Sequence, residues 1–196
     1  MILLRRGGKH AQRELEVLLG RRTPQAKFMP DVWVFPGGVV ELDGADGEPA
    51  RQPEAPDAEE RAHRAAAIRE LSEEAGIDLP ADAELRPWSR WITPEPSRMR
   101  FDTRFYVALA PAHSPPTPDG SEIVEAGWFA PRRALEMHSK GDLGLAFPTI
   151  KHLEELATFR TSAEVMEAAV GRVIRAVMPR IVGKGKEMRE VLPADV

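Results

Sequence analysis

Residues 69–77 read RELSEEAGI, and this short stretch decides both the fold and the chemistry expected of the chain. In a helix, Glu70, Glu73 and Glu74 occupy positions i, i+3 and i+4, so their carboxylates crowd one face. Like charges at this spacing destabilise a helix by roughly 0.2–0.5 kcal/mol per pair, so a positive partner is expected. Arg69 can pair with Glu73, which leaves two carboxylates for a hard divalent cation, Mg²⁺ or Mn²⁺. A solvated acidic helix face is the alternative interpretation.

A glycine turn upstream favours the metal site. Residues 32–35 form a short, apolar, β-prone run that ends at Pro36, Gly37 and Gly38. Two adjacent glycines allow the backbone to turn sharply and to approach a ligand closely. A strand, a glycine turn and a helix with an acidic face together predict a cradle for phosphate and metal.

These segments resemble the Nudix hydrolase family, whose signature is G-x5-E-x7-R-E-U-x-E-E-x-G-U with U aliphatic. Every specified position matches from Arg69 to Ile77. The first half departs from the signature, because Arg69 follows Gly38 by 31 positions instead of 14, an insertion of about 17 residues. The register of the first glutamate falls on Arg61, so that glutamate stays unassigned. Three nearby glutamates are out of register: Glu41, Glu59 and Glu60.

The resemblance implies a metal-dependent hydrolase that cleaves the diphosphate bond of a nucleoside diphosphate linked to another moiety. It assigns Mg²⁺ or Mn²⁺ as cofactor and names Glu70, Glu73, Glu74 and the Gly37 carbonyl as ligands. Glu70, Glu73 and Arg69 would be the catalytic set, with Arg69 orienting a glutamate. The general base is open between Glu73 and two later glutamates. These are Glu122 and Glu125, for which a solvated strand edge is the alternative.

Residues 91–106 bear on the substrate. Arg98, Arg100 and Arg104 are predicted phosphate binders, because guanidinium groups form forked contacts with phosphate. Salt bridges to Glu95 and Asp102, or plain surface charge, are the alternative. The W-x-T-P and R-F-D-T-R-F strings resemble a Nudix branch that includes coenzyme A diphosphatases, so coenzyme A or acyl-CoA is the preferred substrate. ADP-ribose, NADH or another nucleotide sugar, a non-catalytic nucleotide-sensing module, and a structural acidic-helix protein are the competing hypotheses.

The chain is expected to form one α/β domain over residues 1–196, an α/β/α sandwich around a mixed sheet with C-terminal helices. We expect a surface loop at 43–57 and a flexible tail at 183–196. Strands are predicted at 1–4, 15–19, 33–35, 88–93, 103–109 and 123–129. Helices are predicted at 58–75, 131–139, 149–158 and 162–177, the first capped by Asp57 and buried through Ala62, Ala65, Ala66, Ile68 and Leu71.

Composition narrows the function further. With 196 residues, 42% hydrophobic, the chain is long enough for one full core. A net charge of −4 makes nucleic-acid binding unlikely on electrostatic grounds, and no apolar run has the length of a membrane span or secretory signal. Cysteine is absent, which fits a cytoplasmic protein and excludes the cysteine-dependent isomerase branch of the family. A homodimer is an expected option, because Nudix enzymes are often dimers. The five histidines and most aromatic residues are interpreted as surface or packing groups.

Overall fold

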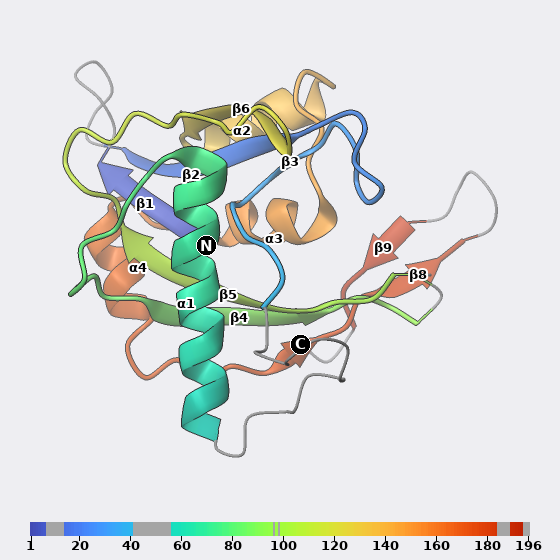
Figure 1. Ribbon diagram of the computed structural model, residues 1–196. Coiled ribbons are helices and arrows are strands. Elements are labelled where there is room, and N and C mark those ends of the chain that lie inside the picture. The colour runs from blue at the N-terminus through green and yellow to red at the C-terminus, as the bar shows by residue number, and fades with distance from the viewer. Residues whose placement is uncertain (7–13, 41–55, 96, 98, 184–188, 194–196) are drawn as a thin grey trace, which may run out of the picture.

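A mixed seven-stranded sheet forms the centre of the fold in the computed structural model, which describes residues 1–6, 14–40, 56–95, 97, 99–183 and 189–193 (Figure 1). The strand order is β3-β2-β1-β5-β4-β7, and β6 pairs with the other edge of β2. The pairs β1–β5 and β4–β7 are parallel, and the others are antiparallel. The strands of this sheet are β1 Ile2–Arg6, β2 Leu15–Arg22, β3 Trp33–Val34, β4 Arg86–Ile92, β5 Asp102–Leu109, β6 Ile123–Phe129 and β7 Ala176–Val177.

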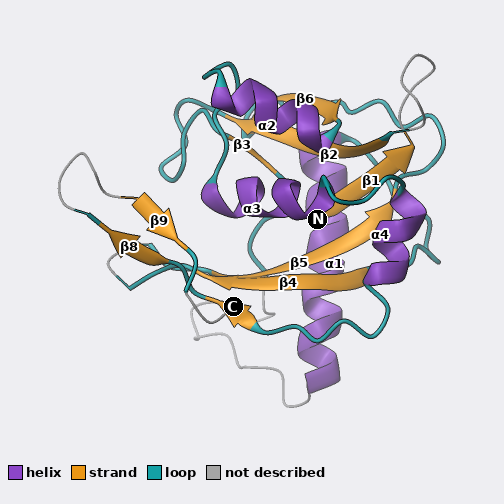
Figure 2. Ribbon diagram, turned by 180° about the vertical axis from the view of Figure 1, so that it is seen from behind, coloured by secondary structure: helices purple, strands orange, loops and turns teal. Residues whose placement is uncertain are grey.

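Helices cover both faces of the sheet, which confirms the predicted sandwich (Figure 2). Helix α1, Pro56–Ala75, packs on one face, and the other face is covered by α2 Pro131–Ser139, α3 Phe147–Leu156 and α4 Ser162–Ala168. Alternation along β1 supplies both layers, since Leu3 faces α1 whereas Ile2 and Leu4 face the other helices. Both cores are therefore built from the same strands.

Helix α1 begins at Pro56, two residues earlier than predicted, so Asp57 lies inside the helix and not at its cap. Most of the loop predicted at 43–57 lies outside the described residues. Ala65 was predicted to be buried, and this is wrong, because the buried stripe runs through Ala67, Ile68, Leu71 and Ala75. The helix is rich in charge, and no helix among the described residues is long and apolar enough to span a membrane.

The C-terminal segment differs most from the prediction. The helix expected over 162–177 stops at Ala168, and the chain then turns through Gly171 in a left-handed conformation with φ +64°. Val173 and Ile174 favour extended backbone, and β7 follows at the edge of β4. The predicted tail contains β9, Arg189–Val191, which pairs antiparallel with β8, Arg180–Val182. Residues 184–188 and 194–196 lie outside the described part.

His152 is buried between the sheet and α3. Its side chain contacts Phe105, Phe35 and Trp91, with ring centroids 4.3, 5.9 and 5.5 Å away. Nδ1 donates to the carbonyl of Pro148 at 2.6 Å, so Nε2 accepts the hydroxyl hydrogen of Ser89 at 2.6 Å. Burial lowers the pKa of His152 to about 3, because the apolar surroundings disfavour the imidazolium. This confirms the interpretation of His152 as a packing residue.

Because His152 is neutral in the folded chain, we predict that acid lowers the free energy of unfolding. Below the ordinary pKa of 6.5 the unfolded chain takes up a proton that the folded chain refuses until about 3, so the free energy of unfolding falls as pH falls. Between pH 7.5 and pH 5 we expect the free energy of unfolding of the wild type to fall by about 2 kcal/mol more than that of His152→Gln. Urea unfolding of both proteins at the two pH values measures this difference, and equal losses would contradict it.

Candidate active site

The turn after β3 is joined to α1 by a hydrogen bond. The backbone N–H of Gly37 donates to Oε2 of Glu74 at 2.8 Å. The next residue, Gly38, faces Glu70 so closely that a Cβ at this position would lie 2.2 Å from Oε1. Glycine is therefore required for the carboxylate of Glu70 to occupy this place. The turn and the acidic face of α1 form one unit, as the sequence pattern predicted.

Glu74 is a buried carboxylate, with 5% of its surface exposed. Burial raises its pKa to about 7, and the negative charges of Glu70 and Glu122 act in the same direction. The hydrogen bond from Gly37 opposes this shift but does not cancel it. A buried carboxyl group between two other carboxylates has a strong tendency to bind a cation or a proton.

Glu70 and Glu73 both bond to the guanidinium of Arg69. The distances are 2.7 Å from Nη2 to Glu70 and 2.6 Å from Nη1 to Glu73. Nη2 also donates to the carbonyl of Val39 at 3.3 Å, so Arg69 links the helix to the glycine turn. Burial raises the pKa of Glu70, and the charges of Glu73 and Glu122 add to this effect while Arg69 opposes it. Arg69 thus has the orienting position that was expected of it.

The donor chemistry fits a hard divalent cation. Glu70 and Glu74 are clustered, mostly buried carboxylates, and burial is the main cause of their raised pKa values. In this structure, however, Glu74 bonds to Gly37 and Glu73 to Arg69. Among the described residues, no three His, Cys, Asp or Glu side chains already surround a common point. Small side-chain rotations on α1 would be needed to gather all three glutamates.

A second loop brings Glu122 to this site. The loop before β6 is fixed to the end of α1, because the Thr117 N–H donates to the carbonyl of Ala75 at 2.7 Å. Asp119 then accepts N–H bonds from Glu122 and Ile123 at 3.0 and 2.8 Å, which shapes the turn. The charge of Glu122 acts on both Glu70 and Glu74. These roles of Thr117 and Asp119 had no signal in the sequence.

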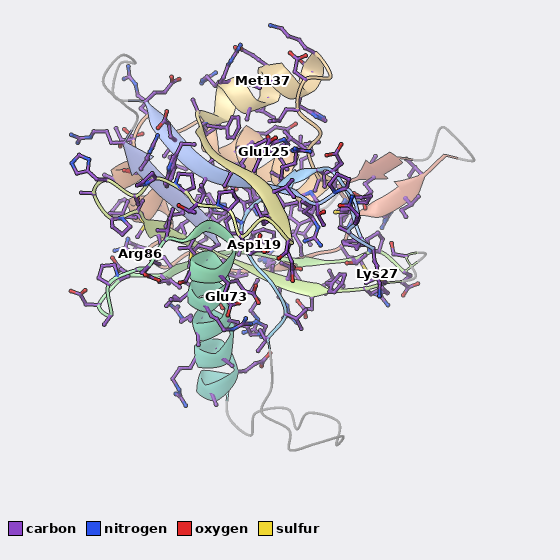
Figure 3. The ribbon with its side chains drawn as sticks, turned by 45° about the horizontal axis from the view of Figure 1, so that its top comes forward. Lys27, Glu73, Arg86, Asp119, Glu125 and Met137 are labelled. Atoms are coloured by element: carbon purple, nitrogen blue, oxygen red, sulfur yellow. The ribbon has the colours of Figure 1, made fainter. Side chains whose placement is uncertain are left out.

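Glu125 is held elsewhere. Its Oε1 accepts from Arg21 of β2 at 2.6 Å, and Arg21 also bonds to Asp31 at 2.5 Å. Figure 3 shows Glu73 on α1 and Glu125 on β6, on different elements. The two later glutamates therefore differ: Glu122 is exposed and its charge acts on Glu70 and Glu74, whereas Glu125 is paired with Arg21 on the sheet.

Comparison with known proteins agrees with this geometry. The family model for the NUDIX domain matches residues 1–146. The chain belongs to the NUDIX domain family. The structural match to a NUDIX hydrolase from Alicyclobacillus acidocaldarius has a TM-score of 0.69 at 26% identity and covers 85% of this chain and 92% of that one.

The curated relatives are longer proteins. Acyl-coenzyme A diphosphatase NUDT19 of Homo sapiens is 28% identical over 116 residues, 57% of this chain. A Caenorhabditis elegans protein with the provisional name nudix hydrolase 7 is 29% identical over 175 residues, 72% of this chain. The chain spans only 31% and 55% of the lengths of these two relatives.

The three arginines predicted to bind substrate lie in different settings in this Nudix domain. Arg104 on β5 pairs with Glu59 and with Oε2 of Glu60, the latter at 3.2 Å, and so fastens the first half of α1 to the sheet. Arg100 donates to the carbonyl of Thr93 at 3.1 Å in the β4–β5 connection and is exposed. Arg98 lies outside the described residues. Glu59 and Glu60, which are out of register with the signature, therefore form ion pairs with Arg104.

Because Glu74 on α1 is buried, we predict that without metal the free energy of unfolding falls as this carboxyl group ionises. Its folded pKa of about 7 lies above the ordinary 4.5, so the folded chain holds the proton more tightly and stability falls as pH rises through this window. From pH 4.5 to pH 8 we expect the wild type to lose about 3 kcal/mol relative to Glu74→Gln. Urea unfolding in excess chelator tests this. If the free energy of unfolding of the wild type rose relative to that of Glu74→Gln between pH 4.5 and pH 8, the raised pKa would be contradicted.

Proposed function

We propose that this Nudix domain hydrolyses the diphosphate bond of coenzyme A or an acyl-CoA, with a divalent cation held by Glu70, Glu73 and Glu74. The observation that carries the proposal is the set of carboxylates on α1 against the Gly37–Gly38 turn, with Glu122 on a second loop close enough for its charge to act on them. The three glutamates of the second half of the box, Glu70, Glu73 and Glu74, are all present, which disfavours a non-catalytic sensing module.

A cation bound here supplies charge neutralisation for the phosphate oxygens and acidifies a coordinated water. Glu70 and Glu74 are the inner ligands, since both are largely buried beside the glycine turn. The Gly37 carbonyl is a further proposed ligand. Glu73, 56% exposed, is able to leave Arg69 and complete the set at the solvent side. Arg69 holds Glu70 and Glu73 and links them to the carbonyl of Val39.

Glu122 is our choice for the general base, in preference to Glu73 and Glu125. A base must stay ionised and unligated, and a carboxylate that coordinates the cation cannot meet both conditions at once. Glu122 stands on a separate loop, whereas Glu73 belongs to the ligand set and Glu125 is engaged by Arg21. Its task is to remove the proton of the attacking water as the bond to phosphorus forms.

Two similarities support coenzyme A or an acyl-CoA as the substrate. The human relative is named an acyl-coenzyme A diphosphatase, and its match covers 57% of this chain. The strings at residues 91–94 and 100–105 point to the same branch. Arg100 is exposed on the β4–β5 connection and is the proposed contact for a substrate phosphate, together with Arg98. We assign Arg104 to positioning α1, because two carboxylates already occupy its guanidinium.

Glu122 and Glu125 form a matched pair for testing the base. Glu122→Gln is expected to lower kcat roughly 10²- to 10⁴-fold, the usual contribution of general base catalysis, with little change in metal affinity. Glu125→Gln removes an exposed pair with Arg21 and should retain nearly full kcat. Steady-state kinetics and manganese titration of both variants make the comparison. An equal loss in both variants would rule out the assignment of Glu122.

The substrate test compares coenzyme A, ADP-ribose, NADH and dinucleoside polyphosphates in the presence of Mg²⁺ or Mn²⁺, with products identified by mass. We expect coenzyme A to give 4′-phosphopantetheine and 3′,5′-ADP faster than the others react. Glu73→Gln is the control for contaminating activity and should lose turnover with folding intact. Turnover of ADP-ribose with inert coenzyme A would overturn the substrate but keep the enzyme class. Full activity in Glu73→Gln would overturn the ligand set.

A further inference from the structure

A hollow of about 340 Å³ lies on the face of the sheet opposite α1. It is lined by residues of β4, α3, the segment after α4, β7 and the residue that follows β9. These elements lie side by side in Figure 2. Its volume falls in the range of small-molecule pockets, roughly 300–1,000 Å³. The proposed reaction uses none of the side chains that line it. The lining residues central to the argument are Trp91, His152, Val177, Leu192, Lys151 and Arg172.

The floor of the hollow is apolar and rigid. Trp91 is 7% exposed and is held by ring contacts with Phe147 and His152. His152 is neutral and has both ring nitrogens bonded, so it offers a ring surface and no charge. Val177 of β7 and Leu192 contribute aliphatic surface, and Leu192 is 38% exposed. Such a surface favours an apolar body, since burial of apolar area is the main driving force.

The rim carries two cations of different mobility. Arg172 bonds to Glu155 at 2.8 Å and stacks over the ring of Trp88 at 4.0 Å, so it is fixed. Lys151 pairs with Glu154 at 2.7 Å across one turn of α3, and the Glu154 side chain is 49% exposed. Exposed pairs of this kind contribute little to stability, so exchange of Glu154 for another carboxylate costs little. An incoming carboxylate would therefore replace Glu154 as the partner of Lys151.

From these observations we infer that the hollow binds a fatty-acid-like molecule, with its chain over Trp91, Val177 and Leu192 and its carboxylate at Lys151. The site is separate from the glycine turn, because the ring of His152 stands between the hollow and Phe35, two residues before Gly37. The inference does not depend on the proposed reaction, and its test requires no turnover.

The experiment is a calorimetric titration of the full chain with decanoate below its micelle concentration. We expect saturable binding at one site per chain, and at least tenfold weaker binding of decanol and of decylammonium. Lys151→Ala should weaken decanoate binding about tenfold. Arg133→Ala is the matched control, because Arg133 and Glu136 form an exposed pair at the same spacing on α2. This control should bind decanoate as the wild type does.

A second variant fills the hollow. Val177→Trp should abolish decanoate binding, with folding checked by circular dichroism, and Lys151→Ala keeps the test valid if Val177→Trp fails to fold. Glu73→Gln should bind decanoate normally, since the hollow does not share the metal site. Non-saturable uptake, equal affinity for decanol, an unchanged Kd in Lys151→Ala, or loss of binding in Glu73→Gln would each overturn the inference.

Discussion

The hydrogen bond between the Gly37 N–H and the buried carboxylate of Glu74 is the constraint on which the site depends. It fixes the turn after β3 against α1, and it does so with a group that has lost most of its hydration. The neighbouring carboxylates make this arrangement unfavourable in isolation. A cation at the same place would reverse the sign of these interactions, because a positive charge favours the ionised form of each carboxyl group. The carboxylates that would bind a cation therefore also destabilise the folded chain when no cation is bound.

The second carboxylate shows how backbone and side chain are matched. Glu70 occupies the volume that any side chain at Gly38 would need, so the glycine is required by close approach. At the other end of the motif, Gly76 is left-handed with φ +62°, and a Cβ there would meet Thr117 at 3.1 Å. Gly38 allows its own loop to approach Glu70, and Gly76 admits the loop at Thr117. The C-terminal part of α1 is therefore contacted by two separate loops.

Local patterns in the sequence were sufficient for six of the seven strands of the sheet, the sandwich and the acidic face of α1. The glutamates at i, i+3 and i+4 and the β-prone run before Gly37 are short-range signals, and the structure keeps them. The predicted burial of Ala65 failed because alanine fits either face of a helix and carries little orientation signal. The predicted helix over 162–177 failed because Gly171 and the β-branched residues beyond it outweigh the amphipathic pattern. The difference between Glu122 and Glu125 depends on Arg21, which is distant in the chain, so no local pattern contains it.

The loop from Pro111 to Gly120 has a consequence for how such a domain diversifies. A hydrogen bond from the Thr117 N–H to the carbonyl of Ala75 ties this loop to the last residue of α1, and Asp119 shapes the turn that carries Glu122. Changes of length in this loop would shift the two halves of the site relative to each other. The β4–β5 connection and the segment after α4 are anchored independently of it. Changes of length at those two places would therefore leave the contact between α1 and the loop at Thr117 in place.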